Sequence, residues 1–447
     1  MAKASKPVAK SVKKPALPFA HLAKDVIANN TIEEPIYADY DVKRGLRNKD
    51  GSGVIAGLTR ISSVIGARQI DGMVERVEGI LKYRGIPIED IINQFNDQSR
   101  FCFETVSFLL LTGKMPTAKD LAELKTFFSD HRPIPKDILD NIIKGLPSKD
   151  IMNKLQNAVC GLYGFDADPD SNDAFENFLK TLSLTAKFPT IIAYSYLAAH
   201  KKNPKFVTPK PDMSLAEGFL YMLSEGKKPS VLEAHILDLC LVLHAEHGGG
   251  NNSAFATYVV TSSGSDVYSA ITAAIGSLKG PLHGAANSKV MKMIADIKQH
   301  LGKEWADLPK LRKYLNAMLQ KKAYDQSGKI YGLGHAVYTK SDPRAIILLK
   351  RAHLLAKQVK REKELQLYIN IAKEGPKEFQ KLKGHEKTIA PNVDFYSGFV
   401  YDCLGIPKEI YTPIFAMARI VGWASHRIEE ILSGKRIIRP GFKYVGK

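Results

Sequence analysis

The sequence predicts a mainly α-helical fold, and three features indicate it. Apolar residues recur at helical spacing along most of the 447-residue chain, alternating strand-like runs are nearly absent, and Gly and Pro separate the helical segments. Over residues 67–83 this spacing predicts a first amphipathic helix with charges on its other face. The same pattern predicts helices at 101–112, 118–130, 176–199, 214–225, 231–246, 253–263, 266–278, 287–300, 304–322, 344–373, 394–404 and 408–433.

Short breaks separate these helices. Segments such as Gly145-Leu146-Pro147 and Gly405-Ile406-Pro407 each end one helix and turn the chain. Charge is denser from about residue 288 to residue 393 than before it, whereas the helices at 253–278 are apolar on most faces. A core domain with a smaller, more solvated companion fits this pattern.

The composition is that of a globular protein. The longest apolar stretches are far shorter than the roughly 20 residues of a membrane span. Four scattered cysteines without a CxxC pair predict a reducing compartment. The lysine-rich start has no apolar core of a secretory signal and is interrupted by Pro7, Pro15 and Pro18, so we expect a disordered tail and a cytoplasmic protein.

The formal charge of +18 admits nucleic acid, an anionic surface or small polyanionic substrates as partners. Lysine is spread along the whole chain, and no RRM, zinc-finger or bZIP pattern accompanies it. The sequence therefore favours a solvated basic surface, with no nucleic-acid or membrane partner.

Two glycine-bounded segments each present a histidine. In KGPLHGAAN, His283 lies at the N-terminal edge of a helix, where the positive potential favours a neutral imidazole that donates to an oxyanion. In YGLGHAVYTKSDPR, His335 shares a connection with Arg344, whose planar fork suits a carboxylate. A histidine that caps a turn and a solvated arginine are the alternatives.

The segment APNVDFYSG places Asp394 among apolar neighbours that would raise its pKa toward the range of a general base. An N-cap aspartate is the alternative. His244 and His247 lie three residues apart on one helix face, but no third ligand is evident, so no metal is expected.

Taken together and in order, HAEHGGGNNS, GPLHGAAN, GLGHAVYTKSDPR, PNVDFYSG and MARIVGWASHRIEE followed by IIRP resemble the citrate synthase family. The resemblance runs from about residue 50 to the C-terminus. It implies an all-α fold in which a smaller helical domain closes over the active site of a larger one. The expected ranges are a basic tail over 1–45, a large domain over 46–287 and 394–447, and the small domain over 288–393.

The resemblance implies that His283, His335 and Asp394 are the catalytic residues. Asp394 would remove a methyl proton from acetyl-CoA, His283 would stabilise the enol or enolate through the thioester oxygen, and His335 would polarise and protonate the ketone of oxaloacetate. Hydrolysis of citryl-CoA would complete the reaction.

The resemblance also implies the substrate ligands. His247, Arg344 and Arg419 would bind oxaloacetate, and Arg439 would reach the site of a neighbouring subunit in a homodimer or larger homo-oligomer. No permanently bound cofactor is implied, since acetyl-CoA is a substrate. Lys387 matches a CoA-contacting position only approximately, while Gly248 and Thr339 depart from the glutamate and arginine of other members.

Other functions remain as alternatives. A 2-methylcitrate synthase has the same catalytic residues and uses propionyl-CoA, and one methyl group changes binding by only about 1–3 kcal/mol. An ATP-dependent citrate-cleaving enzyme would need a nucleotide-binding segment that the chain lacks. A basic nucleic-acid-binding helical protein would explain the charge and leave the five motifs as accidents.

Overall fold

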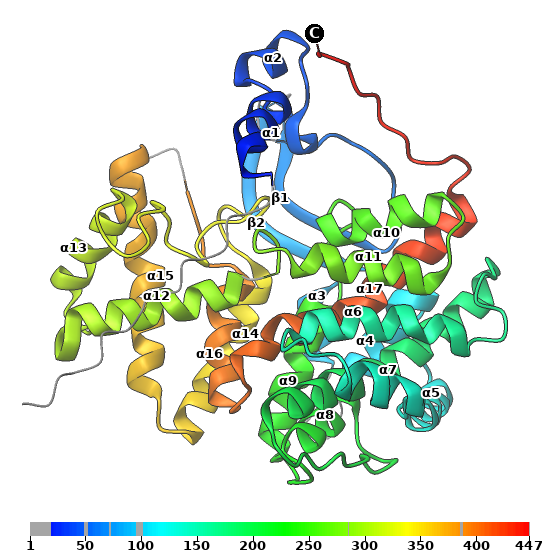
Figure 1. Cartoon of the computed structure of the whole chain (residues 1–447). Helices are drawn as coiled ribbons and strands as arrows, with labels where there is room; N and C mark the ends of the chain where they lie inside the picture. The colour runs from blue at the N-terminus through cyan, green and yellow to red at the C-terminus, as the bar shows by residue number, and fades with distance from the viewer. Residues whose placement is uncertain are drawn as a thin grey trace, which may run out of the picture. The chain divides into compact units, whose positions relative to one another are not determined.

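The computed structural model describes residues 19–48, 52–70, 73–94, 102–284, 286–384 and 388–446. These residues form 17 α-helices, short 3-10 and π segments, and one small sheet (Figure 1), which confirms the mainly α-helical class. The chain divides into two compact units, Met1–Ala56 and Gly57–Lys447. No helix among the described residues has the length and apolarity that crossing a membrane requires.

The described part of the first unit is helical. It contains a 3-10 turn (η1, Ala20–Leu22), α1 (Ala23–Asn30), α2 (Glu34–Asp39) and a second 3-10 turn (η2, Arg44–Leu46). Pro35 stands in the first turn of α2, where its missing N–H costs nothing. The predicted disorder over residues 1–45 therefore differs from the structure from Ala20 onward, and residues 1–18 of that tail lie outside the described residues.

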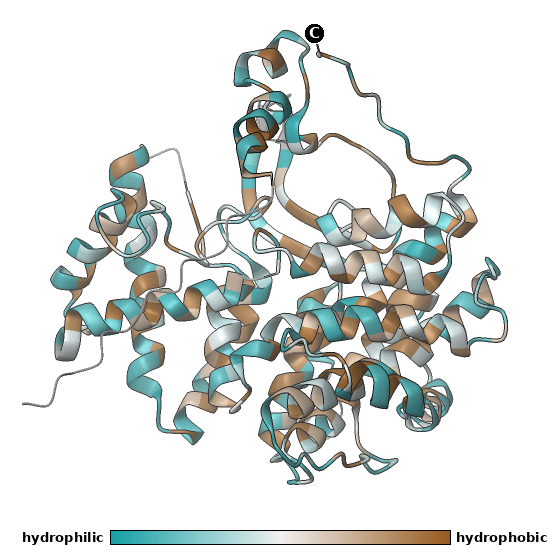
Figure 2. Ribbon diagram, viewed as in Figure 1, coloured by the Kyte–Doolittle hydropathy of each residue, from teal (hydrophilic) through white to brown (hydrophobic). Residues whose placement is uncertain are grey.

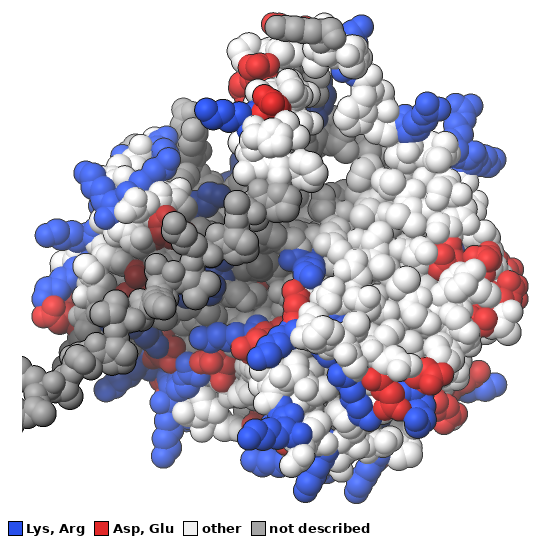
Figure 3. Space-filling view, in the orientation of Figure 1, with Lys and Arg blue, Asp and Glu red and all other residues white. Residues whose placement is uncertain are grey.

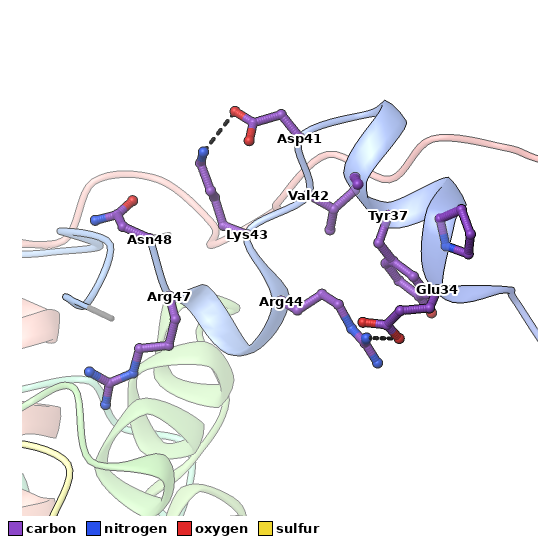
Figure 4. Close-up of a pocket in the computed structure, with 10 residues that line it drawn as sticks. Glu34, Tyr37, Asp41, Val42, Lys43, Arg44, Arg47 and Asn48 are labelled. Atoms are coloured by element: carbon purple, nitrogen blue, oxygen red, sulfur yellow. Dashed lines mark hydrogen bonds and ion pairs between the residues drawn. The ribbon is translucent and has the colours of Figure 1, made fainter. Parts of the chain in front are cut away.

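The guanidinium of Arg44 joins the end of the first unit to α2. It forms an ion pair with Glu34 and lies 4.2 Å from the centre of the Tyr37 ring. The same residues line a cavity of about 510 Å³ within this unit, together with Lys43 and Arg47 (Figure 4).

The second unit begins with a sheet where the sequence predicts a helix. Strands β1 (Ser62–Ile70), β2 (Met73–Tyr83) and β3 (Ile86–Pro87) pair antiparallel in that order, with a bulge between Ile65 and Ala67. The helix predicted over 67–83 is thus wrong. Asp71-Gly72, a dipeptide typical of hairpin turns, stands between the two long strands in the sequence and is the signal that the apolar spacing obscured.

Two strand glycines bring the hairpin against the segment that carries His335. A Cβ at Gly66 would lie 2.2 Å from the Val337 carbonyl oxygen, and a Cβ at Gly79 would lie 2.2 Å from the Ser341 carbonyl oxygen. Only glycine permits this approach of two backbones.

The remaining helices largely confirm the predicted ones. Their bounds are α3 (Ile88–Asn93), α4 (Phe103–Thr112), α5 (Ala118–His131), α6 (Ile151–Leu162), α7 (Ala174–His200), α8 (Leu215–Leu223), α9 (Val231–His244), α10 (Asn252–Ser262), α11 (Val267–Lys279), α12 (Ala286–Leu301), α13 (Leu308–Leu319), α14 (Pro343–Gln358), α15 (Glu362–Lys383), α16 (Val393–Cys403) and α17 (Tyr411–Ser433). The helix predicted over 344–373 is two helices, because the chain takes a left-handed conformation at Lys360, with φ of 56°. Helices α3 and α6 and a π segment at Ile138–Lys144 were not predicted.

Helix α17 is the centre of the core. Every residue from Pro413 to Arg427 is buried, including the large side chains of Trp423 and Arg419. Figure 2 shows hydrophobic residues gathered on the helices around α17, whereas α12 and α15 have mixed faces. In Figure 1, α12, α13 and α15 lie together to one side of the second unit. Because α17 is buried along this length, its side chains are held rigidly in any site that they line.

Candidate active site

Hydrogen bonds between two loops bring the predicted site residues together. The Gly334 N–H donates to the Ala390 carbonyl at 2.8 Å, and the Asn392 side chain donates to the Gly334 carbonyl at 2.9 Å. These bonds join the loop that carries His335 to the start of α16, which carries Asp394. Two stretches far apart in sequence therefore form one wall of the site.

The tautomer of His335 follows from its backbone contacts. The N–H groups of Val337 and Tyr338 point at its Nδ1, at 3.0 and 3.1 Å. Since Nδ1 accepts hydrogen bonds, the neutral ring carries its proton on Nε2. His335 can therefore donate from Nε2 to a carbonyl oxygen, as its predicted role requires.

His247 lies next to His335, with ring centres 5.0 Å apart in an edge-to-face arrangement. It is buried, and its Nε2 has no hydrogen-bond partner among the described residues. Burial, followed by the charges of Arg344 and His335, holds its pKa well below the usual range. A buried polar atom without a partner is costly, so this neutral imidazole is placed to meet a ligand.

Two buried arginines supply positive charge. Arg344 is only 3% exposed, which excludes the alternative of a solvated side chain, and it pairs with the Asp342 carboxylate at 2.8 Å. Arg419 donates from Nε to the His244 carbonyl at 2.6 Å, while its Nη1 has no partner within the described residues. Burial lowers the pKa of Arg419 to about 10, so it stays charged at neutral pH. The Arg419 guanidinium, with an N–H group that lacks a partner, suits an anionic ligand.

Asp394 is not the N-cap of its helix. The side chain of Asn392 takes that role by accepting the Asp394 N–H at 3.0 Å. Burial raises the pKa of the Asp394 carboxyl to about 6, although the charges of Arg344 and Arg419 oppose the rise. The result is a carboxylate that is mostly ionised at neutral pH and still basic enough to take a proton.

His283 is held by a serine that the sequence interpretation missed. Its Nε2 lies 3.0 Å from the hydroxyl of Ser253 on α10, and that hydroxyl accepts the indole N–H of Trp423 at 3.0 Å. Burial, and then the charge of Arg419, lower the pKa of His283 to about 4. The ring is neutral, as expected, and Nδ1 is the nitrogen that remains available to a substrate.

Ser253→Ala is expected to lower kcat about threefold to tenfold, because a hydrogen bond of about 0.5–1.5 kcal/mol that orients His283 is lost. Steady-state kinetics of CoA release would measure it. Ser263→Ala, an exposed serine just beyond the same helix, is the matched control. An unchanged kcat in Ser253→Ala would show that this bond does not orient His283.

A second buried network lies directly behind His247. Glu246 accepts from His426 Nε2 at 2.9 Å and from the Ser62 hydroxyl at 2.9 Å. The hydroxyl of Tyr258 lies 2.8 Å from His426 Nδ1 and donates to Glu429 at 2.7 Å. The motif HAEH contained Glu246, but nothing in the sequence indicated its partners.

This network contains an ion pair. Burial alone would raise the pKa of Glu246, but the charge and hydrogen bond of His426 hold it at about 2. Burial alone would lower the pKa of His426, but Glu246 raises it to about 9. A buried imidazolium and carboxylate thus fix the residue that precedes His247.

One predicted residue, Arg439, does not join the site in this chain. Arg439 is exposed in the segment after α17, where the neighbouring Ile438 N–H donates to the Ser262 hydroxyl at 3.0 Å. Lys387 lies outside the described residues. Among the described residues, no three His, Cys, Asp or Glu side chains are grouped as a metal site would require, and His244 instead contacts the Cys240 carbonyl at 2.7 Å.

Comparison with known proteins identifies the family. Residues 50–441 match the family model described as the C-terminal domain of citrate synthase. Curated relatives include a citrate synthase from Deinococcus radiodurans (39% identical, covering 83% of this chain and 90% of the relative) and citrate synthase 2 from Bacillus subtilis (34% identical, 88% and 94%). A 2-methylcitrate synthase from Shewanella oneidensis is 34% identical over 82% of this chain and 88% of its own length.

Solved structures show the same fold. A citrate synthase from Pyrobaculum aerophilum matches with a TM-score of 0.73 at 30% identity, over 89% of this chain and 91% of that one. A citrate synthase from Thermoplasma acidophilum, solved with carboxymethyl coenzyme A and oxaloacetate, matches with a TM-score of 0.72 at 28% identity, over 91% and 96% of the two chains. The chain belongs to the citrate synthase family.

Proposed function

We propose that this chain is an acyltransferase that condenses acetyl-CoA with oxaloacetate and water to form citrate and CoA. The observation that carries the proposal is a partly buried carboxylate with a pKa of about 6, Asp394, in a site with two neutral histidines, His247 and His283, and two buried arginines. Membership of the citrate synthase family supports it. A second acyl substrate, propionyl-CoA, is the alternative because a 2-methylcitrate synthase is similar at 34% identity.

The first step forms an enol or enolate. Asp394 removes a proton from the methyl carbon of acetyl-CoA, and the electrons of that C–H bond form the new carbon–carbon double bond. Negative charge develops on the thioester oxygen, where an N–H of neutral His283 donates a hydrogen bond. A neutral imidazole is suited to this task because it stabilises the oxygen without protonating it early.

The second step forms the carbon–carbon bond. The nucleophilic methylene carbon attacks the ketone carbon of oxaloacetate, whose oxygen accepts the Nε2 proton of His335. Water then attacks the thioester carbonyl of citryl-CoA, the C–S bond breaks, and CoA leaves as the thiol. No permanently bound cofactor takes part in these steps.

Oxaloacetate is a dianion, and the proposed ligands match it. Arg344 and Arg419 supply charge, and His247 presents Nε2 to a polar atom of the substrate. We propose that Arg439 of a second subunit completes the site, since it is exposed in the segment after α17. We also propose that residues 288–393 close over the bound substrate and exclude water.

Two residues are candidates for contacts with CoA, Thr339 and Lys387. Thr339 stands where some family members have arginine, and its hydroxyl is buried without a partner among the described residues. Lys387 remains a candidate for a CoA phosphate. Cytoplasmic localisation is proposed from the four free cysteines, which fit a reducing compartment.

The spread of charge argues against a nucleic-acid partner. Figure 3 shows Lys and Arg scattered over one face with Asp and Glu among them, and not gathered into one stripe. A nucleic-acid interface would concentrate them along one surface.

Release of free CoA thiol by the purified protein tests the proposed reaction. With oxaloacetate and acetyl-CoA we expect rapid release that depends on oxaloacetate. The ratio of kcat/KM for acetyl-CoA and propionyl-CoA then assigns the acyl substrate. Absence of release with both thioesters would refute the proposal.

Mixed oligomers test the shared site. Arg439→Ala and Asp394→Asn subunits are each expected to be inactive alone, whereas a co-expressed mixture should regain activity because some sites combine an intact Arg439 with an intact Asp394. Native mass spectrometry would confirm that mixed oligomers form. Mixed oligomers without regained activity would contradict the contribution of Arg439 across subunits.

A further inference from the structure

Tyr338 contacts three of the proposed substrate-facing residues. Its ring stacks on His335, with centres 4.9 Å apart and planes inclined by 24°. It meets the edge of His247 at 5.4 Å, and the guanidinium of Arg344 lies 5.7 Å from its ring centre.

The ring itself has little freedom to move. Tyr338 is 1% exposed, and its hydroxyl donates to the Ile80 carbonyl of β2 at 3.4 Å. A Cβ at Gly79 would lie only 2.8 Å from Tyr338 Cδ1, so the strand presses directly against the ring. The hairpin thus supports one side of the ring while site residues contact the other parts.

The backbone of Tyr338 acts on the same histidine. Its N–H donates to His335 Nδ1 at 3.1 Å and helps to place the ring proton on Nε2. The stacked ring sets the plane of the imidazole, and the backbone sets its tautomer. Both properties decide where the Nε2 proton is directed.

We propose that Tyr338 is a positioning residue for the condensation: its ring aligns His335 for proton donation and holds Arg344 and His247 in the geometry that binds oxaloacetate. The role rests on the proposed function. The aromatic ring is responsible for this role, because the stacking on His335, the edge contact with His247 and the cation–π contact with Arg344 all require it. The hydroxyl contributes less, since its hydrogen bond is long.

Substitutions separate the ring from the hydroxyl. Tyr338→Phe keeps the ring, so its kinetic constants should stay within about twofold of wild type. Tyr338→Leu removes the ring, and we expect kcat to fall about 10- to 100-fold because misplacement of a reacting group is costly. The KM for oxaloacetate should rise as well, whereas the KM for acetyl-CoA should not change. If Tyr338→Leu does not fold, Tyr338→Met takes its place in the test, because methionine has a long side chain without a ring.

The matched control is Tyr331→Leu, which removes a tyrosine from the start of the same loop. Tyr331 bonds to Asp325 and Ser327 and has no contact with the three site residues in the described structure. Its kinetic constants should stay near wild type. Isothermal titration of each variant with oxaloacetate gives a readout independent of turnover, and a thermal melt of each variant reports its folding.

Separate results refute the two proposals. A wild-type protein that releases no CoA refutes the condensation itself. An active wild type with a Tyr338→Leu variant of equal kcat and equal oxaloacetate affinity refutes the positioning role. If Tyr338→Leu raises the KM values for oxaloacetate and acetyl-CoA together, the tyrosine has a purely structural role and the positioning role is refuted. The same conclusion follows if Tyr338→Phe loses as much activity as Tyr338→Leu.

Discussion

Asp394→Asn is expected to lower kcat for condensation about 1,000-fold or more, near the upper part of the range for loss of a general base. The amide has almost the shape of the carboxylate but cannot take the methyl proton. Because the Asp394 carboxylate accepts no hydrogen bond from the described residues, the substitution should leave the fold intact. Thiol release under saturating substrates measures the effect.

Asp402→Asn is the matched control for this variant. Asp402 lies on the same helix, α16, and pairs with Arg361 at 2.7 Å, away from the proposed site residues. It should retain nearly full activity. Oxaloacetate should still bind to Asp394→Asn, as titration calorimetry would show. Condensation by Asp394→Asn at a rate near wild type would exclude Asp394 as the base.

The pH dependence of the wild type follows from the same carboxyl. With a pKa of about 6, Asp394 loses its basic form as the pH falls. We expect kcat/KM to be level above pH 7 and to fall about tenfold per pH unit below about 6. His283, with a pKa of about 4, should not affect this limb above pH 5. An acid limb centred near the ordinary aspartate pKa would contradict the raised pKa of Asp394.

Glu246→Gln is expected to lower the free energy of unfolding by about 3–5 kcal/mol, the usual cost of breaking a buried ion pair. Both Glu246 and His426 are fully buried, and the substitution removes the carboxylate 2.9 Å from the imidazolium, leaving only the more distant Glu429 at 3.7 Å. The midpoint of urea unfolding would report the loss. Asp140→Asn, which breaks exposed pairs with Lys136 and Lys144, is the control and should change the midpoint little.

The ion pair also predicts how stability depends on pH. The folded-state pKa of His426, about 9, is raised, so its contribution is complete below the unfolded value of 6.5 and is lost as the pH rises through 9. The pKa of Glu246 is lowered from 4.5 to about 2, so its contribution is present above 4.5 and is lost as the pH falls through 2. In Glu246→Gln the loss of stability between pH 7 and 9 should be absent or smaller. An identical pH profile in the variant would exclude this pair as its source.

The sequence by itself determined most helices and the identity of the site motifs. Helices such as α5 and α7 follow from apolar spacing and from caps at Thr117 and Asp173, which depend on residues within a few positions. The histidines and the aspartate were recognisable because short glycine- and proline-bounded segments present them. These signals are local, and local interactions can be inferred from neighbouring residues.

Tertiary structure decided the hairpin, for which Asp71-Gly72 was the one local signal, and it alone decided the supporting contacts of the site. The apolar spacing of residues 67–83 suits a helix, but pairing of β1 with β2 and close backbone contact at Gly66 and Gly79 favour a sheet. His426 meets Glu246 across 180 residues of sequence, and Trp423 meets Ser253 across 170. Such contacts arise only when packed helices bring distant residues together, so the spacing of residues along the chain carries no signal for them.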